Sequence, residues 1–208
     1  MNIPVIYEDE WLLVVDKPAG LLSIPSPKNE SRTLTSILNE DLKSRNIPWR
    51  LHPCHRLDKD TSGLMIYAKG KAVQKKMMLL FKDKLIKKTY LAFVHGNLKK
   101  ETGEIKTDIG GLAAQTKFRV VAGKSNFSVV EVEPLTGKTN QIRIHFKYLN
   151  HPLVGETKFV FRKDFTLRAK RLMLHAKSLN FLHPITGKPI NLTSPFPGYF
   201  EQFLKEHN

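Results

Sequence analysis

Short apolar runs separated by turn-forming residues dominate the chain. Val130 and Val132 alternate with Glu131 and Glu133, which is the two-residue period of a strand with one buried face. Other runs are rich in β-branched and aromatic residues and lie between turn-forming residues. Strands are therefore expected at residues 5–7, 11–15, 64–68, 90–94, 117–121, 128–133, 178–182 and 189–193, the last two joined by a hairpin loop.

Four segments show the three- and four-residue spacing of a helix with one apolar face. Ser31 or Thr33 is suited to cap the first of them. The apolar positions are Leu34, Ile37, Leu38 and Leu42; Val73, Met77, Leu80 and Phe81; Ile142, Phe146 and Leu149; and Phe200, Phe203 and Leu204.

Strands outnumber helices, and no internal repeat is visible. This balance predicts an α+β fold with a mixed, mostly antiparallel β-sheet core and peripheral helices. The chain has 208 residues, a length that suits one domain with a substantial core. We therefore expect a single domain over residues 1–208.

The formal charge of +15 is unevenly distributed along the chain. Residues 1–68 carry a net charge of −1, residues 69–106 carry +8 and residues 141–177 carry +7. A polyanionic partner is the interpretation favoured by two separated basic segments, whereas a solvated soluble surface explains a charge run without any partner.

Several classes of protein are excluded or disfavoured. No apolar run approaches the ~18 residues of a membrane span, and residues 1–10 lack the pattern of a signal peptide. A single cysteine, Cys54, excludes an intramolecular disulfide and fits a reducing compartment, so a cytoplasmic location is expected.

Two partial matches to cofactor and metal motifs are incomplete. The Gly-Lys-Thr at 137–139 ends like a phosphate-binding loop, but the upstream glycine is replaced by Val132. His52, Cys54 and His55 lack a second ligand pair at metal-site spacing. The sequence therefore implies no cofactor and no metal. Cys54 as a nucleophile stays open, although no nearby residue clearly marks it as a thiolate.

One segment carries chemistry. Residues 55–64 read His-Arg-Leu-Asp-Lys-Asp-Thr-Ser-Gly-Leu, a loop that enters a strand through a turn. Arg56 and Lys59 would favour the ionised form of Asp58. By composition alone, an ordinary loop ion pair or an Asx turn is the favoured explanation of Asp58, ahead of a catalytic role.

The pattern His-Arg-Leu-Asp-x-x-Thr-Ser-Gly-Leu resembles the signature of the RluA-type pseudouridine synthases at every specified position. The resemblance extends over nearly the whole chain. Its further blocks are residues 5–20, ending Lys-Pro-Ala-Gly; 88–96, with Lys-x-Tyr-x-Ala-x-Val-x-Gly; 136–145, containing Gln-Ile-Arg-Ile-His; 151–155; 171–176; and 183–187.

This resemblance implies an RNA pseudouridine synthase, which isomerises uridine without a cofactor. Asp58 would be the essential carboxylate, acting as a nucleophile or as a base at C2′. Tyr90 would stack on the uracil, and Arg143 would pair with Asp58. Leu174 is a weaker candidate for a pocket wall, and Arg56 for an RNA contact. Without the resemblance, Tyr90 and Leu174 are ordinary strand residues, and Arg143 is an ordinary helix residue.

Two positions depart from the family pattern, since Lys138 and Asn140 stand where members usually have Arg and His. Many relatives also carry an N-terminal S4-like RNA-binding domain, and the sequence begins directly at the catalytic blocks. We therefore expect RNA selection by the surface of the catalytic domain itself.

The expected partner is a structured rRNA or tRNA, or both, with a looped uridine, because a looped base leaves its stack at lower cost. A monomer is expected. The alternative is a catalytically silent basic RNA-binding or chaperone module, which would have lost Asp58, Tyr90 or Arg143. A hydrolase that uses Cys54 is the third interpretation.

Overall fold

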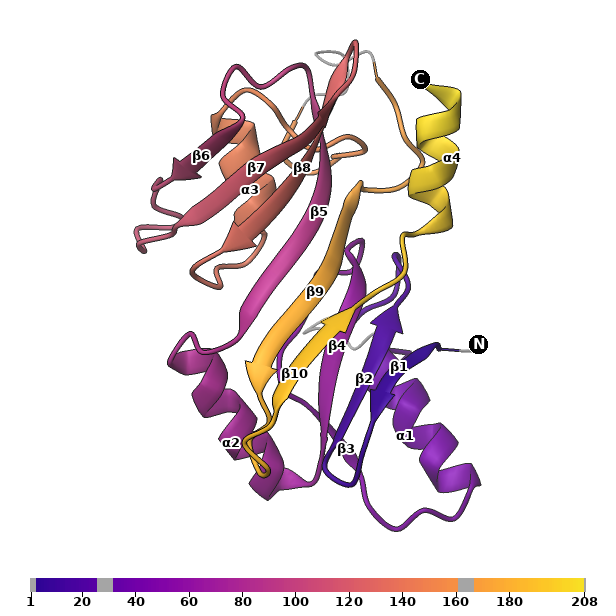
Figure 1. Cartoon of the computed structure of the whole chain (residues 1–208). Coiled ribbons are helices and arrows are strands. Elements are labelled where there is room, and N and C mark those ends of the chain that lie inside the picture. The colour runs from indigo at the N-terminus through magenta and orange to yellow at the C-terminus, as the bar shows by residue number, and fades with distance from the viewer. Residues whose placement is uncertain (1–2, 26–31, 161–166, 208) are drawn as a thin grey trace. The chain divides into compact units, whose positions relative to one another are not determined.

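The computed structural model describes residues 3–25, 32–160 and 167–207, in which four helices and ten strands are found (Figure 1). The helices are α1 (Leu34–Ser44), α2 (Lys71–Lys82), α3 (Gln141–Tyr148) and α4 (Gly198–Glu206). The strands are β1 (Val5–Glu8), β2 (Leu12–Lys17), β3 (Leu51–Pro53), β4 (Ser62–Lys69), β5 (Lys87–His95), β6 (Thr102–Ile105), β7 (Thr116–Gly123), β8 (Phe127–Pro134), β9 (Leu174–Leu182) and β10 (Pro189–Thr193). Within the described part, no helix has the length and apolar character to cross a membrane.

The chain divides into two compact units. Unit 1 contains Met1–Lys87 and Ser178–Ser194, and unit 2 contains Lys88–Lys177 and Pro195–Asn208. Strand β9 contributes residues to both units. The prediction of a single catalytic domain over residues 1–208 stays a prediction.

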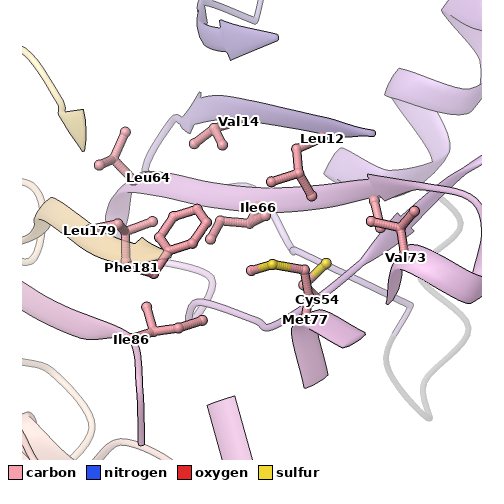
Figure 2. Close-up of a cluster of buried hydrophobic side chains, with 11 residues drawn as sticks. Leu12, Val14, Cys54, Leu64, Ile66, Val73, Met77, Ile86, Leu179 and Phe181 are labelled. Atoms are coloured by element: carbon pink, nitrogen blue, oxygen red, sulfur yellow. The ribbon is translucent and has the colours of Figure 1, made fainter. Parts of the chain in front are cut away.

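In unit 1 the strands follow the order β1-β2-β4-β9, with β3 on β4 and β10 on β9. Strand β2 is antiparallel to β4, and Val14 lies opposite Ile66. Because side chains alternate along a strand, Val14 and Ile66 face the cluster that contains Met77 of α2 (Figure 2). Leu13 and Met65 face the other cluster, with Leu34 of α1. The two helices therefore cover opposite faces of this sheet.

The sheet of unit 2 is also covered by one helix on each face. Its strands follow the order β9-β5-β8-β7-β6, and β5, β8, β7 and β6 pair in antiparallel fashion. One face packs Ala92 and Val130 against Phe146 of α3. The opposite face packs Phe93 against Phe200 of α4, with ring centroids 4.6 Å apart.

The predicted α+β class with a mostly antiparallel sheet is confirmed. All four expected helices and all eight expected strands are present. Thr33 is the N-cap of α1, since its hydroxyl accepts a hydrogen bond from the Ser36 N–H at 3.2 Å, whereas Ser31 lies outside the described residues. Strands β3 and β6 were not predicted, and β9 begins four residues earlier than expected.

Candidate active site

Asp58 opens a tight turn just before β4. Its backbone carbonyl accepts a hydrogen bond from the Thr61 N–H at 3.1 Å, so the chain reverses over Lys59 and Asp60. Ser62 and the residues that follow are buried in β4, whereas Asp58 is only half-buried. The turn therefore fixes the aspartate at the point where the chain emerges from the core.

Ser23 anchors the residue that precedes Asp58. The Ser23 hydroxyl donates to the Leu57 carbonyl at 2.7 Å and accepts from the Leu57 N–H at 3.0 Å. Ser23 is 2% exposed and Leu57 is 4% exposed, so water has little access to either bond. A buried hydroxyl with both bonds satisfied holds the backbone at Leu57 in one position.

Lys17 anchors the residue that follows Asp58. Its ammonium donates to the carbonyls of Pro18, Leu21 and Lys59 at 2.9, 2.7 and 3.0 Å. The Gly20 N–H donates to the same Lys59 carbonyl at 2.8 Å, and Gly20 has a φ of 86°, which favours glycine. The Lys-Pro-Ala-Gly block of the sequence is thus a clamp on the Asp58 turn.

The charge of Lys17 also affects the ionisation of groups in this turn. Its side chain is fully buried, and burial lowers its pKa to about 8. The carboxylates of Asp60, Asp58 and Asp16 partly offset this effect. By the same Coulombic attraction, the lysine favours the ionised form of Asp58.

The two residues before Leu57 differ in environment. The Nε2 atom of His55 accepts a hydrogen bond from the Ile66 N–H at 3.0 Å, and its ring lies 4.8 Å from the Phe81 ring. Arg56 is exposed. The histidine therefore fixes the loop against β4, and the arginine side chain is accessible to a ligand.

In unit 2, Tyr90 and Leu174 belong to one apolar cluster. Leu174 is 3% exposed within it, and the half-buried Tyr90 packs against the cluster. Ile142 of α3 lies in the same cluster, next in sequence to Arg143. The tyrosine, the leucine and the helix that carries the arginine therefore share one face of the unit 2 sheet.

Arg143 is held in a fixed orientation. Its Nε and Nη2 atoms donate to the two carboxylate oxygens of Glu156, each at 2.7 Å, and Nη1 donates to Asn140 Oδ1 at 3.0 Å. The Phe159 ring lies 5.1 Å from the guanidinium carbon. Asn140, one of the two departures from the family pattern, has a φ of 56°, a conformation that Asn tolerates better than most residues.

A second network orders the start of α3. Gln141 accepts from the Thr136 hydroxyl at 2.6 Å and donates to Thr116 Oγ1 at 2.9 Å. His145 Nε2 lies 2.9 Å from the Thr107 carbonyl and therefore donates to it, so Nδ1 accepts from the Thr116 hydroxyl. Burial lowers the pKa of His145, consistent with a neutral ring.

The structure thus brings Asp58 and Arg56 together on one loop of unit 1, and Tyr90 and Leu174 together with the helix of Arg143 in unit 2. The pairing of Arg143 with Asp58 stays a prediction. The supporting residues Ser23, Lys17, Glu156 and Gln141 were not singled out from the sequence. Lys17, Glu156 and Gln141 lie inside or next to the family blocks. Their place in these blocks is the only feature of the sequence that could have identified them.

The interpretation of Cys54 as a nucleophile is wrong. Cys54 is 7% exposed and belongs to the apolar cluster between β4 and α2 (Figure 2). Burial raises the pKa of its thiol to about 12, so the reactive thiolate is not formed near neutral pH. Among the residues that the structure describes, no three His, Cys, Asp or Glu side chains gather closely enough to hold a metal ion.

Comparison with known proteins identifies the relatives of this chain. A family model described as RNA pseudouridylate synthase matches residues 11–148. The RNA pseudouridine synthase YlyB of Bacillus subtilis, named as uncharacterized, is 35% identical over 214 residues, which are 95% of this chain and 70% of that protein. The dual-specificity RNA pseudouridine synthase RluA of Haemophilus influenzae is 33% identical over 208 residues, with 92% of each chain covered.

A solved human structure shares the fold. Human RNA Pseudouridylate Synthase Domain Containing 4 superposes with a TM-score of 0.83, at 22% identity, over 97% of this chain and 92% of that chain. The matched family model and the relatives above 30% identity extend the likeness from fold to family. The chain therefore belongs to the RNA pseudouridylate synthase family, is of the RluA type, and is an enzyme that isomerises uridine in RNA.

Proposed function

We propose that this chain uses Asp58 as the essential carboxylate to convert uridines of structured rRNA, tRNA or both to pseudouridine. The bond between N1 of uracil and C1′ of ribose breaks, a bond between C5 and C1′ forms, C5 loses its proton and N1 gains one. Asp58 acts as a nucleophile or as a base at C2′. The observation that carries the proposal is the turn of Asp58, which is anchored on both sides by Ser23 and Lys17.

Preorganisation is the physical reason that these anchors matter. A carboxylate on an anchored turn needs little reorganisation to reach the reacting atoms, and a small misplacement lowers the rate steeply. Arg143 in this proposal pairs with Asp58 and keeps it ionised. Its fixed orientation on Glu156 supports such a role, since a guanidinium that is already held loses little entropy on pairing.

Tyr90 and Leu174 form the binding surface for the uracil in this proposal. The Tyr90 ring stacks on the base, and Leu174 provides an apolar wall beside it. Their membership in one cluster supports a shared surface. Stacking of a base on an aromatic ring contributes about 1–3 kcal/mol, which offsets part of the cost of extracting the uridine from its stack.

The substrate class rests on the names of relatives and on charge. One relative is named ribosomal large subunit pseudouridine synthase C, of Buchnera aphidicola, and another is the dual-specificity RluA. Exposed Arg56 next to Asp58 is suited to a phosphate or to the gap left by the extracted base. The lysines of residues 69–106 would contact more distant phosphates of the looped RNA. The enzyme is proposed to act as a monomer.

The test compares Asp58→Asn with Asp60→Asn, a matched control, since Asp60 is an exposed carboxylate in the same turn. Pseudouridine in rRNA and tRNA is mapped by carbodiimide adducts after incubation with each protein. Asp58→Asn is expected to lose at least about 10³-fold in rate, whereas Asp60→Asn stays within about threefold of wild type. Normal pseudouridine formation by Asp58→Asn would contradict the proposal, and RNA binding by a wild-type protein that isomerises no uridine would support the silent binding module instead.

A further inference from the structure

Lys88 lies two residues before Tyr90 on β5 (Figure 1). Because side chains alternate along a strand, Lys88, Tyr90, Ala92 and Val94 project from the same face. Ala92 and Val94 are fully buried under α3, Tyr90 is half-buried, and Lys88 at the start of the row is also half-buried. The ammonium group therefore lies at the edge of the surface on which the uracil is proposed to stack.

Among the described residues, no carboxylate forms an ion pair with Lys88. Two other lysines with restricted exposure have partners, since Lys17 donates to three carbonyls and Lys177 pairs with Glu131 at 2.7 Å. For Lys88, by contrast, no ion pair or hydrogen bond of the side chain is found within residues 3–25, 32–160 and 167–207. Burial lowers the pKa of Lys88, and no opposing charge offsets it.

A desolvated cation without a partner costs free energy in the folded protein. Apolar packing alone would be served as well by Met or Leu at this position. An ammonium at such a site gains its counter-charge when an anion binds. The anion that accompanies a stacked nucleotide is a backbone phosphate, for which lysine is a common ligand in proteins.

We propose that Lys88 binds a backbone phosphate of the RNA next to the uridine stacked on Tyr90. It would thereby favour a uridine within an RNA chain over a free nucleoside. The inference rests on the proposed function of Tyr90. Two residues along a strand span about 6.6 Å, a distance that the flexible lysine stem can bridge to a phosphate adjoining the base. Binding of the phosphate would oppose the lowering of the Lys88 pKa by burial.

The experiment compares Lys88→Met, which keeps the apolar stem, with Lys88→Arg, which keeps the charge. Lys205→Met is the control, because Lys205 is an exposed lysine of the same unit that lies outside the basic segments 69–106 and 141–177. The Kd for a full-length tRNA transcript and for a transcribed large-subunit rRNA fragment is measured between low and physiological salt. The single-turnover rate at saturating RNA is measured on any transcript that the wild type modifies.

Lys88→Met is expected to weaken RNA binding about tenfold and to reduce the slope of log affinity against log salt by about one. The rate at saturating RNA should change less than threefold, and Lys88→Arg should restore most of the affinity. The melting temperature of Lys88→Met should equal or exceed that of wild type, because the substitution removes an uncompensated charge. A structural lysine would instead give a lower melting temperature.

Affinity and salt slope of Lys88→Met equal to those of wild type would overturn the inference, as would an equal loss in Lys205→Met. Failure of the proposed function is seen separately. A wild-type protein that forms no pseudouridine in either RNA refutes that function. The slopes of log affinity against log salt for wild type and Lys88→Met still test the phosphate contact of Lys88 in that case.

Discussion

The guanidinium of Arg143 and the carboxylate of Glu156 form a two-point ion pair, with both N···O distances 2.7 Å. Glu156 is itself fixed, because its Oε1 atom also accepts from the backbone N–H groups of Thr157 and Lys158 at 2.9 and 2.7 Å. The Glu156 side chain is fully buried and that of Arg143 is 7% exposed. The loop after α3 thus determines the direction in which the arginine projects.

Replacement of Glu156 by Gln should impair both stability and activity. Gln keeps the shape but removes the buried carboxylate charge that faces Arg143, and loss of one partner of a buried ion pair typically costs about 3–5 kcal/mol. The single-turnover rate should fall about 10- to 100-fold, since the arginine is no longer held. Chemical denaturation and single-turnover assays on a modified RNA measure the two effects.

Glu156→Asp serves as the conservative variant, and Asn140→Gly removes the hydrogen bond from Arg143 Nη1 while tolerating the positive φ at this position. We expect a smaller loss of rate from either variant than from Glu156→Gln. A Glu156→Gln protein with wild-type rate would show that the orientation of Arg143 is unimportant for the reaction.

Replacement of Lys17 by Met should loosen the Asp58 turn. Three carbonyls lose their donor, and the expected loss in free energy of unfolding is about 2–4 kcal/mol, reduced by the removal of a buried charge. The rate at saturating RNA should fall more than the affinity for RNA. Lys43→Met, on the exposed side of α1 and outside the basic segments, is the control and should change neither the stability nor the rate. Equal stability of the Lys17 variant and wild type would show that the hydrogen bonds of Lys17 do not hold the Asp58 turn.

Acid should destabilise the protein through His175. This histidine is 1% exposed, and burial lowers its pKa from 6.5 to about 4. Below pH 6.5 the unfolded chain takes up a proton at His175 and the folded chain does not, so the free energy of unfolding falls as the pH drops from 6.5 to 4. The full effect of one such group is about 3 kcal/mol.

Denaturation curves of wild type and His175→Gln between pH 4 and pH 8 test this dependence. The difference in stability between the two proteins should be constant above pH 7 and should shrink or reverse toward pH 4. Parallel curves over the whole range would mean that His175 has the same pKa in the folded and unfolded chains, which would contradict this prediction.

Cys54 should be inert in the native protein. Iodoacetamide should modify the thiol only after unfolding, because burial raises its pKa to about 12. Cys54→Ala should retain wild-type activity and lose about 1 kcal/mol of stability from the small cavity it creates. Rapid alkylation of native protein with loss of activity would contradict the structure.

The sequence predicted the elements well because their patterns are local. The alternation of Val130 and Val132 with Glu131 and Glu133 marked β8, and the spacing of Val73 and Met77 marked α2. The three-residue strand β3 and the short strand β6 carry too few apolar residues to show a period. Their pairing with β4 and β7 depends on neighbours distant in sequence.

The residues of the candidate site also differ in how far the sequence alone could predict them. Asp58, Tyr90 and Arg143 became candidates because each lies in one of the family's sequence motifs, and these motifs also indicated the family. Ser23 lies in no such block, and its bonds to Leu57 join residues 34 positions apart. Glu156 follows one block, but nothing in the one-dimensional pattern marks it as the partner of Arg143.

The sequence alone determined the α+β class, the family and the residues expected to perform the reaction, since periodicity and contiguous motifs are properties of neighbouring residues. The tertiary structure decided which buried groups hold those residues: the Lys17 clamp, the Ser23 anchor and the Glu156 ion pair. It also decided that Cys54 is a core residue and that Lys88 lacks a counter-charge. Burial and long-range hydrogen bonds arise only when distant segments pack together, and they set the protonation and orientation on which the chemistry depends.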